Sequence, residues 1–97
     1  MYNKNLLSSC DNVPFIVVKN EEIGEVNWQS LDMTEFTCEE LIKCNIEDIF
    51  RRLRVGPNVD IDKIDVRTEY FLFTKSLEVK FVSIKVIQKE EEKIYVF

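Results

Sequence analysis

The sequence predicts one α+β domain spanning residues 1–97, with a four- or five-stranded, mainly antiparallel sheet and one long helix packed on one face. Three observations lead to this fold class. Apolar residues recur with helical spacing after Thr37, they alternate with polar residues in the C-terminal half, and the chain has only two glycines and two prolines. So few turn-forming residues favour long elements, and a hydrophobic fraction of 45% is enough for one core.

The helix is predicted to begin at Thr37 and to end before Gly56 and Pro57. Thr37 and Glu40 have the spacing of a capping box, in which two side chains satisfy two backbone amides at the start of a helix. In an alternative reading the helix breaks at Asn45, which then caps a second, short helix. One face of the predicted helix carries apolar side chains at helical spacing, namely Cys38, Ile42, Ile46, Ile49 and Leu53.

Three strands are predicted after the helix, arranged as an antiparallel meander. The first is a long strand over residues 64–72, in which apolar and polar residues alternate. The second, over residues 77–86, places Leu77, Val79 and Phe81 toward the core, and the phase then shifts to Val82, Ile84 and Val86, which predicts a β-bulge near Phe81. The third covers residues 94–97 and follows a turn at residues 90–92.

A shorter hairpin is predicted ahead of the helix. Residues 15–18 form a β-rich apolar run after Pro14, and Val26 and Trp28 are predicted to pair with this run across a turn at residues 20–24. Trp28 is expected in the core, and the alternative is that Trp28 and Phe36 serve as aromatic anchors beside the acidic residues that bind a partner. Residues 1–12 and 29–36 show no periodicity, so no element is predicted there.

The residue inventory excludes several kinds of catalytic and cofactor site. The chain has no histidine, which removes histidine-based triads and histidine-ligated metals, and its two glycines cannot form a phosphate-binding loop. Its three cysteines, Cys10, Cys38 and Cys44, contain no CxxC pair, so neither a zinc site nor a disulfide framework is predicted. On the predicted helix Cys44 faces outward as an accessible thiol, and Cys38 faces the core. We predict no catalytic residues, no metal, no cofactor and a cytoplasmic location.

Nucleic-acid and membrane partners are not predicted either. The basic cluster of Arg51, Arg52 and Arg54 lies in a chain of net charge -5, and Arg51 and Arg52 have acidic residues four positions earlier on the helix. The longest apolar runs, such as residues 15–18, are far shorter than the ~20 residues that cross a bilayer.

One group of carboxylates suggests a different, catalytic function. An acidic residue on one strand followed by Glu-x-Lys on its hairpin partner resembles the PD-(D/E)xK nucleases, and the resemblance implies a Mg²⁺ site whose lysine helps to activate water. The same residues also fit a strand whose polar side chains face solvent. The residues that carry this resemblance are Asp60, Asp62, Asp65, Glu78 and Lys80.

Charge is distributed unevenly along the chain. Residues 1–50 hold ten acidic side chains and three lysines, a net charge of -7, whereas residues 51–97 hold ten basic and eight acidic side chains, a net charge of +2. An acidic face of this kind would steer a basic partner and accelerate its association. The alternative is a mildly acidic surface that serves solubility alone.

These observations together predict a small acidic protein-binding module. Its most specific form is an inhibitor of immunity-protein or antitoxin type that neutralises a basic, nuclease-like protein toxin by direct binding. The alternatives are a small Mg²⁺-dependent nuclease and a homodimeric interaction protein that pairs through residues 94–97 as an edge strand. Large aromatic residues within a charged rim are typical hot spots. The predicted partner-binding residues are Glu21, Glu22, Glu25, Asp32, Glu35, Phe36, Glu39 and Glu40.

Overall fold

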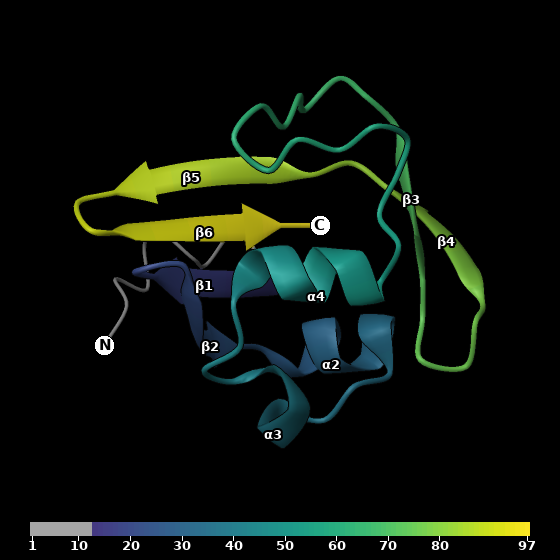
Figure 1. Cartoon of the computed structure of the whole chain (residues 1–97), viewed down its shortest axis with the longest axis horizontal. Coiled ribbons are helices and arrows are strands. Elements are labelled where there is room, and N and C mark those ends of the chain that lie inside the picture. The colour runs from purple at the N-terminus through teal and green to yellow at the C-terminus, as the bar shows by residue number, and fades with distance from the viewer. Residues whose placement is uncertain (1–12) are drawn as a thin grey trace.

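The computed structural model describes residues 13–97 and arranges them in two antiparallel sheets and three short helices (Figure 1). The predicted α+β class and the four-stranded antiparallel sheet are confirmed, and the single long helix is not. In chain order the elements are β1 (Phe15–Lys19), β2 (Glu22–Val26), α2 (Trp28–Thr34), α3 (Cys38–Leu41), α4 (Ile46–Arg52), β3 (Tyr70–Phe73), β4 (Val79–Val82), β5 (Lys85–Lys89) and β6 (Glu92–Val96).

The main sheet has the strand order β2-β1-β6-β5, and all neighbouring strands are antiparallel. β1 lies between β2 and β6, so that Val17 is opposite Glu25 on one side and Ile94 on the other. β6 is in turn paired with both β1 and β5. The prediction that residues 94–97 form an open edge strand is therefore wrong, because β6 has a hydrogen-bonded neighbour on each side.

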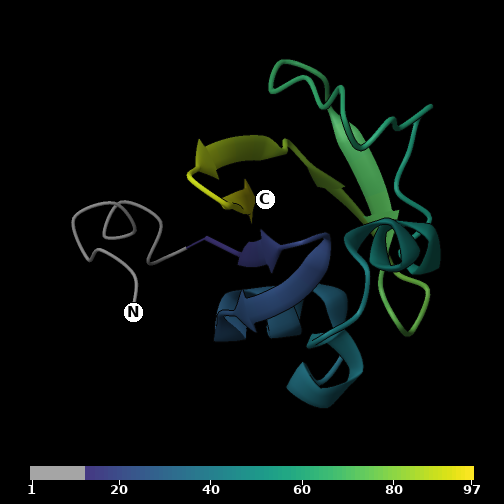
Figure 2. The same cartoon turned by 60° about the vertical axis from the view of Figure 1, so that its left-hand side comes forward.

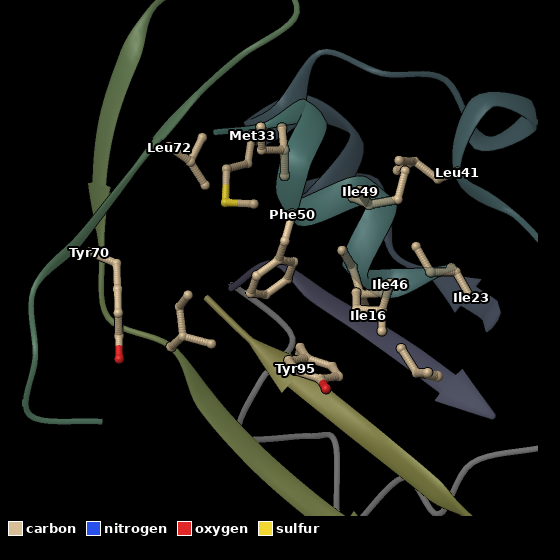
Figure 3. Packing of buried hydrophobic residues seen from close by; sticks show 13 residues of the cluster. Ile16, Ile23, Met33, Leu41, Ile46, Ile49, Phe50, Tyr70, Leu72 and Tyr95 are labelled. Carbon is tan, nitrogen blue, oxygen red and sulfur yellow. The ribbon is translucent and has the colours of Figure 1, made fainter. Parts of the chain in front are cut away.

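The main core lies between the inner face of this sheet and α4 (Figure 3). Ile46, Ile49, Phe50 and Leu53 follow the spacing i, i+3, i+4, i+7, and all four are buried. The ring of Phe50 meets the ring of Tyr95 on β6 edge to face, with 5.7 Å between ring centroids. This apolar face, predicted from the sequence, fixes α4 on the sheet.

The predicted long helix is interrupted between α3 and α4. The capping box of Thr37 and Glu40 is confirmed, but the helix stops after one turn and Lys43 has a left-handed φ of 69°. The segment between the helices pairs instead with β2. Ile23 N donates to Cys44 O at 2.9 Å, and Lys43 N donates to Ile23 O at 2.7 Å. These bonds replace the helical hydrogen bonds that a continuous helix would make, so tertiary pairing overrides helix propensity here.

The second helix starts at Asn45, as in the alternative reading of the sequence. Asn45 Oδ1 accepts a hydrogen bond from Glu47 N at 2.8 Å, which satisfies one of the free amides at the start of α4. Ile46 N donates to Glu21 O at 2.9 Å and joins the same helix start to the β1–β2 turn. The beginning of α4 is therefore fixed both locally and by the neighbouring hairpin.

α2 lies where the sequence predicts no element. Its buried residues are Ser30, Met33 and Thr34, so most of its buried positions are polar and the apolar periodicity of a helix is missing. Ser30 Oγ donates to Asn27 O at 2.7 Å, and Thr34 Oγ1 donates to Ser30 O at 2.9 Å, which satisfies both hydroxyls inside the fold. Trp28, at the start of α2, is 69% exposed, so the expectation that it lies in the core is wrong.

β3 and β4 form a separate two-stranded sheet instead of joining β6 in one meander. Figures 1 and 2 both place this hairpin beside the C-terminal end of α4, where Phe73 N donates to Leu53 O at 2.7 Å. The predicted strand over residues 64–72 is wrong in its first half, because regular pairing begins only at Tyr70. Residues 60–69 run through turns, and Asp65 N donates to the Tyr70 hydroxyl at 3.0 Å.

The change of phase after Phe81 marks a change of sheet and not a β-bulge. The chain leaves β4 after Val82, passes Ser83 and Ile84, and enters the main sheet as β5. On β4 it is Lys80 and Val82 that are partly buried, whereas Val79 and Phe81 are 48% and 67% exposed. The prediction that Leu77, Val79 and Phe81 face the core is therefore wrong.

Candidate functional site

A small cavity opens where four segments of the chain meet. The turn of the β1–β2 hairpin, the end of the β5–β6 hairpin, the start of α4 and the loop at Ile61 and Asp62 enclose about 150 Å³. Most of its lining side chains are polar or charged. They are Val18, Asn20, Glu21, Asn45, Ile46, Glu47, Ile61, Asp62, Gln88, Glu91, Lys93 and Tyr95.

One wall of the cavity is the β1–β2 turn. Asn20 and Glu21 have φ angles of 52° and 67°, the left-handed pair that closes a two-residue hairpin, and asparagine adopts this region at low cost. The Glu21 carbonyl accepts the hydrogen bond from Ile46 N described above. This bond holds the turn against the start of α4 and places Glu21 on the cavity wall.

The opposite wall is the β5–β6 hairpin. Gln88 Nε2 donates to Glu90 O at 3.0 Å and to Glu92 O at 3.1 Å, so the amide braces the turn. Lys93 and Tyr95 of β6 lie on the inner face of the sheet and line the cavity. Figure 3 shows the Tyr95 hydroxyl at the end of the ring that points away from Phe50. The phenol thus brings an apolar ring to the core and a polar oxygen toward the cavity.

The electrostatics of the cavity favour a positively charged group. Glu21, Glu47, Asp62 and Glu91 contribute four carboxylates to its lining, and Lys93 contributes the one ammonium. Two of the carboxylates also have exposed partners outside the lining, because Glu47 lies 3.8 Å from Arg51 and Glu91 lies 3.8 Å from Lys19. Burial raises the pKa of the Tyr95 hydroxyl, and the nearby charges of Asp62 and Glu47 raise it further. A negative potential that opposes ionisation of Tyr95 stabilises a cation in the same space.

A second, more open groove adjoins the cavity on the far side of Ile61 and Asp62. It has a volume of about 590 Å³ and runs along α4, past Phe50, toward Val55 and Val59. Arg51 and Arg54 lie along it together with Glu47, Asp60 and Asp62, so its charges are mixed. The groove shares Glu47, Ile61 and Asp62 with the cavity.

The structure does not bring the predicted partner-binding residues into one site. Glu21 lines the cavity, and Glu22 is next to it, opposite Asn45. Glu25 lies opposite Val17 on β1, where burial and the charge of Glu92 raise its pKa. The remaining predicted residues lie on or beside α2 and α3, and they are Asp32, Glu35, Phe36, Glu39 and Glu40.

Glu35, Phe36 and Glu40 each make contacts within the fold. Glu35 Oε1 accepts a hydrogen bond from Ser76 N at 2.9 Å, and the hydrogen bonds from Ser76 and Thr74 lower the pKa of its carboxyl group. Phe36 packs against the main core. Asp32 and Glu39 of this region are exposed, and within residues 13–97 neither forms an ion pair.

The two cysteines of the described chain are placed opposite to the prediction. Cys38, expected on the core face, is exposed. Cys44, expected to be accessible, packs against the main core and its Sγ donates to Glu40 O at 3.1 Å. The break in the helix before Asn45 rotates Cys44 inward. The third cysteine, Cys10, lies outside the described residues.

The residues that resemble a nuclease motif have different surroundings from one another. Asp60 and Asp62 line the groove along α4, and Asp65 accepts hydrogen bonds from Arg67 N at 2.9 Å and Arg67 Nε at 3.4 Å. Lys80 Nζ donates to Met33 O at 2.9 Å, and Glu78 is exposed. Within residues 13–97, no group of three or more His, Cys, Asp or Glu side chains is arranged to hold a metal ion.

Of the four cavity carboxylates, the sequence predicts only Glu21 as a binding residue, and it does not predict that the four lie together. In the sequence Glu47 is an i,i+4 partner of Arg51, Asp62 is part of the nuclease resemblance, and Glu91 is a turn residue. The usable signal was the tip of each predicted hairpin, because Glu21 and Glu91 occupy the turns of two hairpins whose strands are neighbours. Lys93 and Tyr95 lie on β6, the strand of the second hairpin that pairs with β1 of the first.

Comparison with known proteins gives a structure of similar fold and no family. The sequence matches no protein-family model and no curated protein. The structure is similar to the crystal structure of a PAS domain from a two-component sensor histidine kinase, with a TM-score of 0.56 and 17% sequence identity. The alignment covers 96% of this chain and 89% of that chain. In the described part of the chain, no helix has the length and apolar character needed to span a membrane.

Proposed function

We propose that this chain is a non-catalytic binding domain whose cavity receives a positively charged side chain of a basic protein. The convergence of Glu21, Glu47, Asp62 and Glu91 around the cavity carries this proposal. A volume of about 150 Å³ is well below the ~300 Å³ at which sites for drug-sized ligands begin, and it suits the head of a lysine or arginine. The carboxylates would also steer a basic protein toward the cavity before contact.

The narrower proposal is an inhibitor of immunity-protein or antitoxin type that acts in the cytoplasm against a basic, nuclease-like toxin. Its support is the net charge of -5 and the free thiols of Cys38 and Cys44, which suit a reducing compartment. One structure of similar fold is named as a PAS domain from a sensor histidine kinase, and the binding role is carried over from it by analogy of fold alone. An exposed aromatic residue, Trp28, is available as an additional anchor.

A charge-matched pair of variants tests the proposal. The double variant Glu47→Gln with Asp62→Asn removes two cavity charges, and Asp32→Asn with Glu39→Gln removes two charges from α2 and α3. Both leave the same net charge. Proteins captured from the source lysate at low salt are identified by mass spectrometry, and the affinity of each purified basic protein is then measured by calorimetry at low and high salt. We expect the cavity pair to weaken binding at least tenfold and the control pair to leave it nearly unchanged. Equal losses would mean that net charge alone attracts the partner, and they would exclude the cavity.

A second candidate function is the recognition of a free small cation, as in a sensor domain. Two observations favour it. The cavity is enclosed by four segments of the chain, and the side chains of Asn20, Asn45 and Gln88 in its lining can form hydrogen bonds with a small ligand. The probes are n-butylammonium and butylguanidinium, with n-butanol as the neutral control, and the readout is the NMR shift of the Lys93 and Tyr95 amides. Saturable shifts with the cations alone, in a protein that captures no basic protein, would favour the small-molecule role. Shifts with none of the three would exclude the cavity as a cation site.

A further inference from the structure

The hydroxyl of Tyr95 is a buried polar group that the described fold leaves without a partner. Tyr95 is only 2% exposed, and within residues 13–97 its hydroxyl forms no hydrogen bond. By contrast, the hydroxyl of Tyr70, the other buried tyrosine of this part of the chain, accepts a hydrogen bond from Asp65 N at 3.0 Å. Buried polar groups are nearly always paired, so an unpaired one needs an explanation.

The Tyr95 hydroxyl opens into the cavity described above. Tyr95 is one of the lining residues, and Figure 3 shows its oxygen at the end of the ring that points away from Phe50. Within residues 13–97, no side-chain oxygen or nitrogen is both fully buried and unpaired, so the small exposed part of Tyr95 includes this oxygen. A group that enters the cavity can therefore reach the hydroxyl.

Two carboxylates lie near this hydroxyl, and they belong to two other segments of the chain. Burial raises the pKa of Tyr95, and the nearby charges of Asp62, on the loop after α4, and Glu47, in the first turn of α4, raise it further. The phenol therefore keeps its proton at neutral pH, and its oxygen can still accept a hydrogen bond. Three groups with acceptor oxygens thus lie close together in the cavity lining.

The ion pair of Glu47 with Arg51 does not remove Glu47 from this group. The two side chains are 3.8 Å apart, which is longer than a hydrogen bond, and both are more than half exposed. Arg51 makes its shorter contact with Asp48 Oδ1, at 3.0 Å. Asp62 forms no ion pair within residues 13–97. Both carboxylates are therefore available to a cation in the cavity.

The cavity offers hydrogen-bond acceptors and lacks an aromatic cage. Proteins that bind quaternary ammonium groups enclose them among aromatic rings. Among the described residues that line the cavity, Tyr95 is the only aromatic one, and its ring packs edge to face on Phe50 in the core. The lining therefore matches a cation that carries N–H donors, such as a primary ammonium or a guanidinium, better than a quaternary one.

We propose that Tyr95 determines the specificity of the cavity for cations that carry N–H donors, by accepting a hydrogen bond from the bound cation. This role of Tyr95 rests on the proposed function, because it concerns the same cavity and the same positively charged group. The ammonium of a lysine side chain has three N–H donors, one for each of Tyr95, Glu47 and Asp62. A trimethylated lysine keeps its charge and has no donor, so it would leave the hydroxyl unpaired. The cavity thus distinguishes an unmodified lysine of a basic partner from a trimethylated one.

The test compares two cations of equal charge in titrations of the full chain. The probes are n-butylammonium and n-butyltrimethylammonium, and the NMR shifts of the backbone amides at positions 93 and 95 give the affinity for each. We expect the natural chain to bind n-butylammonium at least tenfold more tightly, as the loss of a hydrogen bond to a charged group predicts. Tyr95→Phe should abolish this preference, because it removes the hydroxyl and keeps the ring on Phe50.

Tyr70→Phe is the matched control, since it removes a buried phenol hydroxyl outside the cavity. It should lower the thermal stability, because Asp65 N loses its acceptor, and it should keep the preference for n-butylammonium. Tyr95→Phe should show the reverse, with an unchanged stability and no preference. A purely structural role of the Tyr95 hydroxyl would instead lower the stability of Tyr95→Phe and leave its preference intact.

Three outcomes would overturn this role of Tyr95. Equal affinity of the natural chain for the two cations would remove the role and leave the proposed cation site standing. A preference that persists in Tyr95→Phe would show that the cavity excludes the methyl groups by size alone. Binding of neither cation would overturn the cation site itself and, with it, the role of Tyr95.

Discussion

The ammonium group of Lys75 lies 2.9 Å from Glu40 Oε2 and 3.0 Å from Glu40 Oε1, and it joins the turn of the β3–β4 hairpin to the first turn of α3. The same ammonium lies 5.8 Å from the centre of the Phe36 ring. Lys75 N also donates to Thr34 O at 3.0 Å. The hairpin, which has no strand neighbour in the main sheet, is thus fastened to the helices through its turn.

This contact predicts a dependence of stability on pH. The hydrogen bond from Thr37 N and the contact with Lys75 lower the pKa of Glu40, so the folded state binds this proton less readily than the unfolded state. The resulting stabilisation is fully present at neutral pH and is lost as the pH falls through the lowered pKa. Glu40→Gln should therefore destabilise the protein at neutral pH, and the loss should shrink as the pH falls through the lowered pKa of Glu40. Urea unfolding over a series of pH values from neutral downward measures it, with Glu39→Gln as the charge-matched control. Equal effects of the two variants would show that the contact contributes nothing specific.

Asn27 is expected to be the most sensitive polar residue of the N-terminal half. Its Oδ1 accepts from Phe15 N and Ser30 N, both at 3.0 Å, and its Nδ2 donates to Val13 O at 2.9 Å. Asn27→Ala removes all three bonds and should cost about 2 kcal/mol of unfolding free energy. Asn27→Asp keeps the acceptor and loses the donor, so it should cost less. Chemical denaturation gives the order of the two variants, and an aspartate as damaging as alanine would assign the whole effect to the bond with Val13.

The two glycines should respond differently to the same substitution. A Cβ at Gly56 would lie 2.6 Å from the tip of the Phe71 ring, whereas a Cβ at Gly24 would meet nothing within 4 Å. Gly56→Ala should therefore cost about 1–3 kcal/mol, as overpacking does. Gly24→Ala should be neutral or slightly stabilising. Thermal unfolding of both variants measures the difference, and Phe71→Leu added to Gly56→Ala should recover part of the loss. Equal effects at both glycines would mean that the ring moves aside freely.

The break between α3 and α4 can be tested by the sign of one substitution. Lys43 is exposed and has a left-handed φ of 69°, a conformation that costs roughly 1 kcal/mol for a residue with a Cβ. Lys43→Gly should therefore be neutral or stabilising. Arg52→Gly, at an exposed position within α4, should cost about 1 kcal/mol. Urea unfolding of the two variants decides the matter, because a similar loss at position 43 would indicate one continuous helix.

The elements that the sequence predicts well are those whose signals are local. The β1–β2 and β5–β6 hairpins follow from short apolar runs around turn residues, and the capping box of Thr37 and Glu40 is read directly from its spacing. The break at Lys43 depends on hydrogen bonds with Ile23, which lies on a distant strand, so no local pattern contains it. α2 is missed because hydroxyls fill most of its buried face.

The candidate site is harder to predict than the fold. Grouping acidic residues by their position in the chain selects residues 21–40, but the cavity draws its carboxylates from the β1–β2 turn, α4, the loop at Asp62 and the β5–β6 turn. Only Glu21 belongs to both sets. Glu35 and Glu40, which look free in the sequence, are engaged by Ser76 and Lys75 through contacts with the β3–β4 turn. Which carboxylates remain free is decided by the tertiary packing.

The central place of β6 also decides when the protein can fold as it is made. A ribosome releases the β1–β2 hairpin early, but the strand that lies beside β1 follows every other described element of the chain. At roughly 5–20 residues per second, the hairpin waits several seconds with one edge of β1 unpaired and with Phe15 and Val17, which pack against Ile94 of β6, uncovered. During that interval the nascent chain exposes apolar surface that a chaperone can bind, and slow translation between β2 and β6 would prolong it.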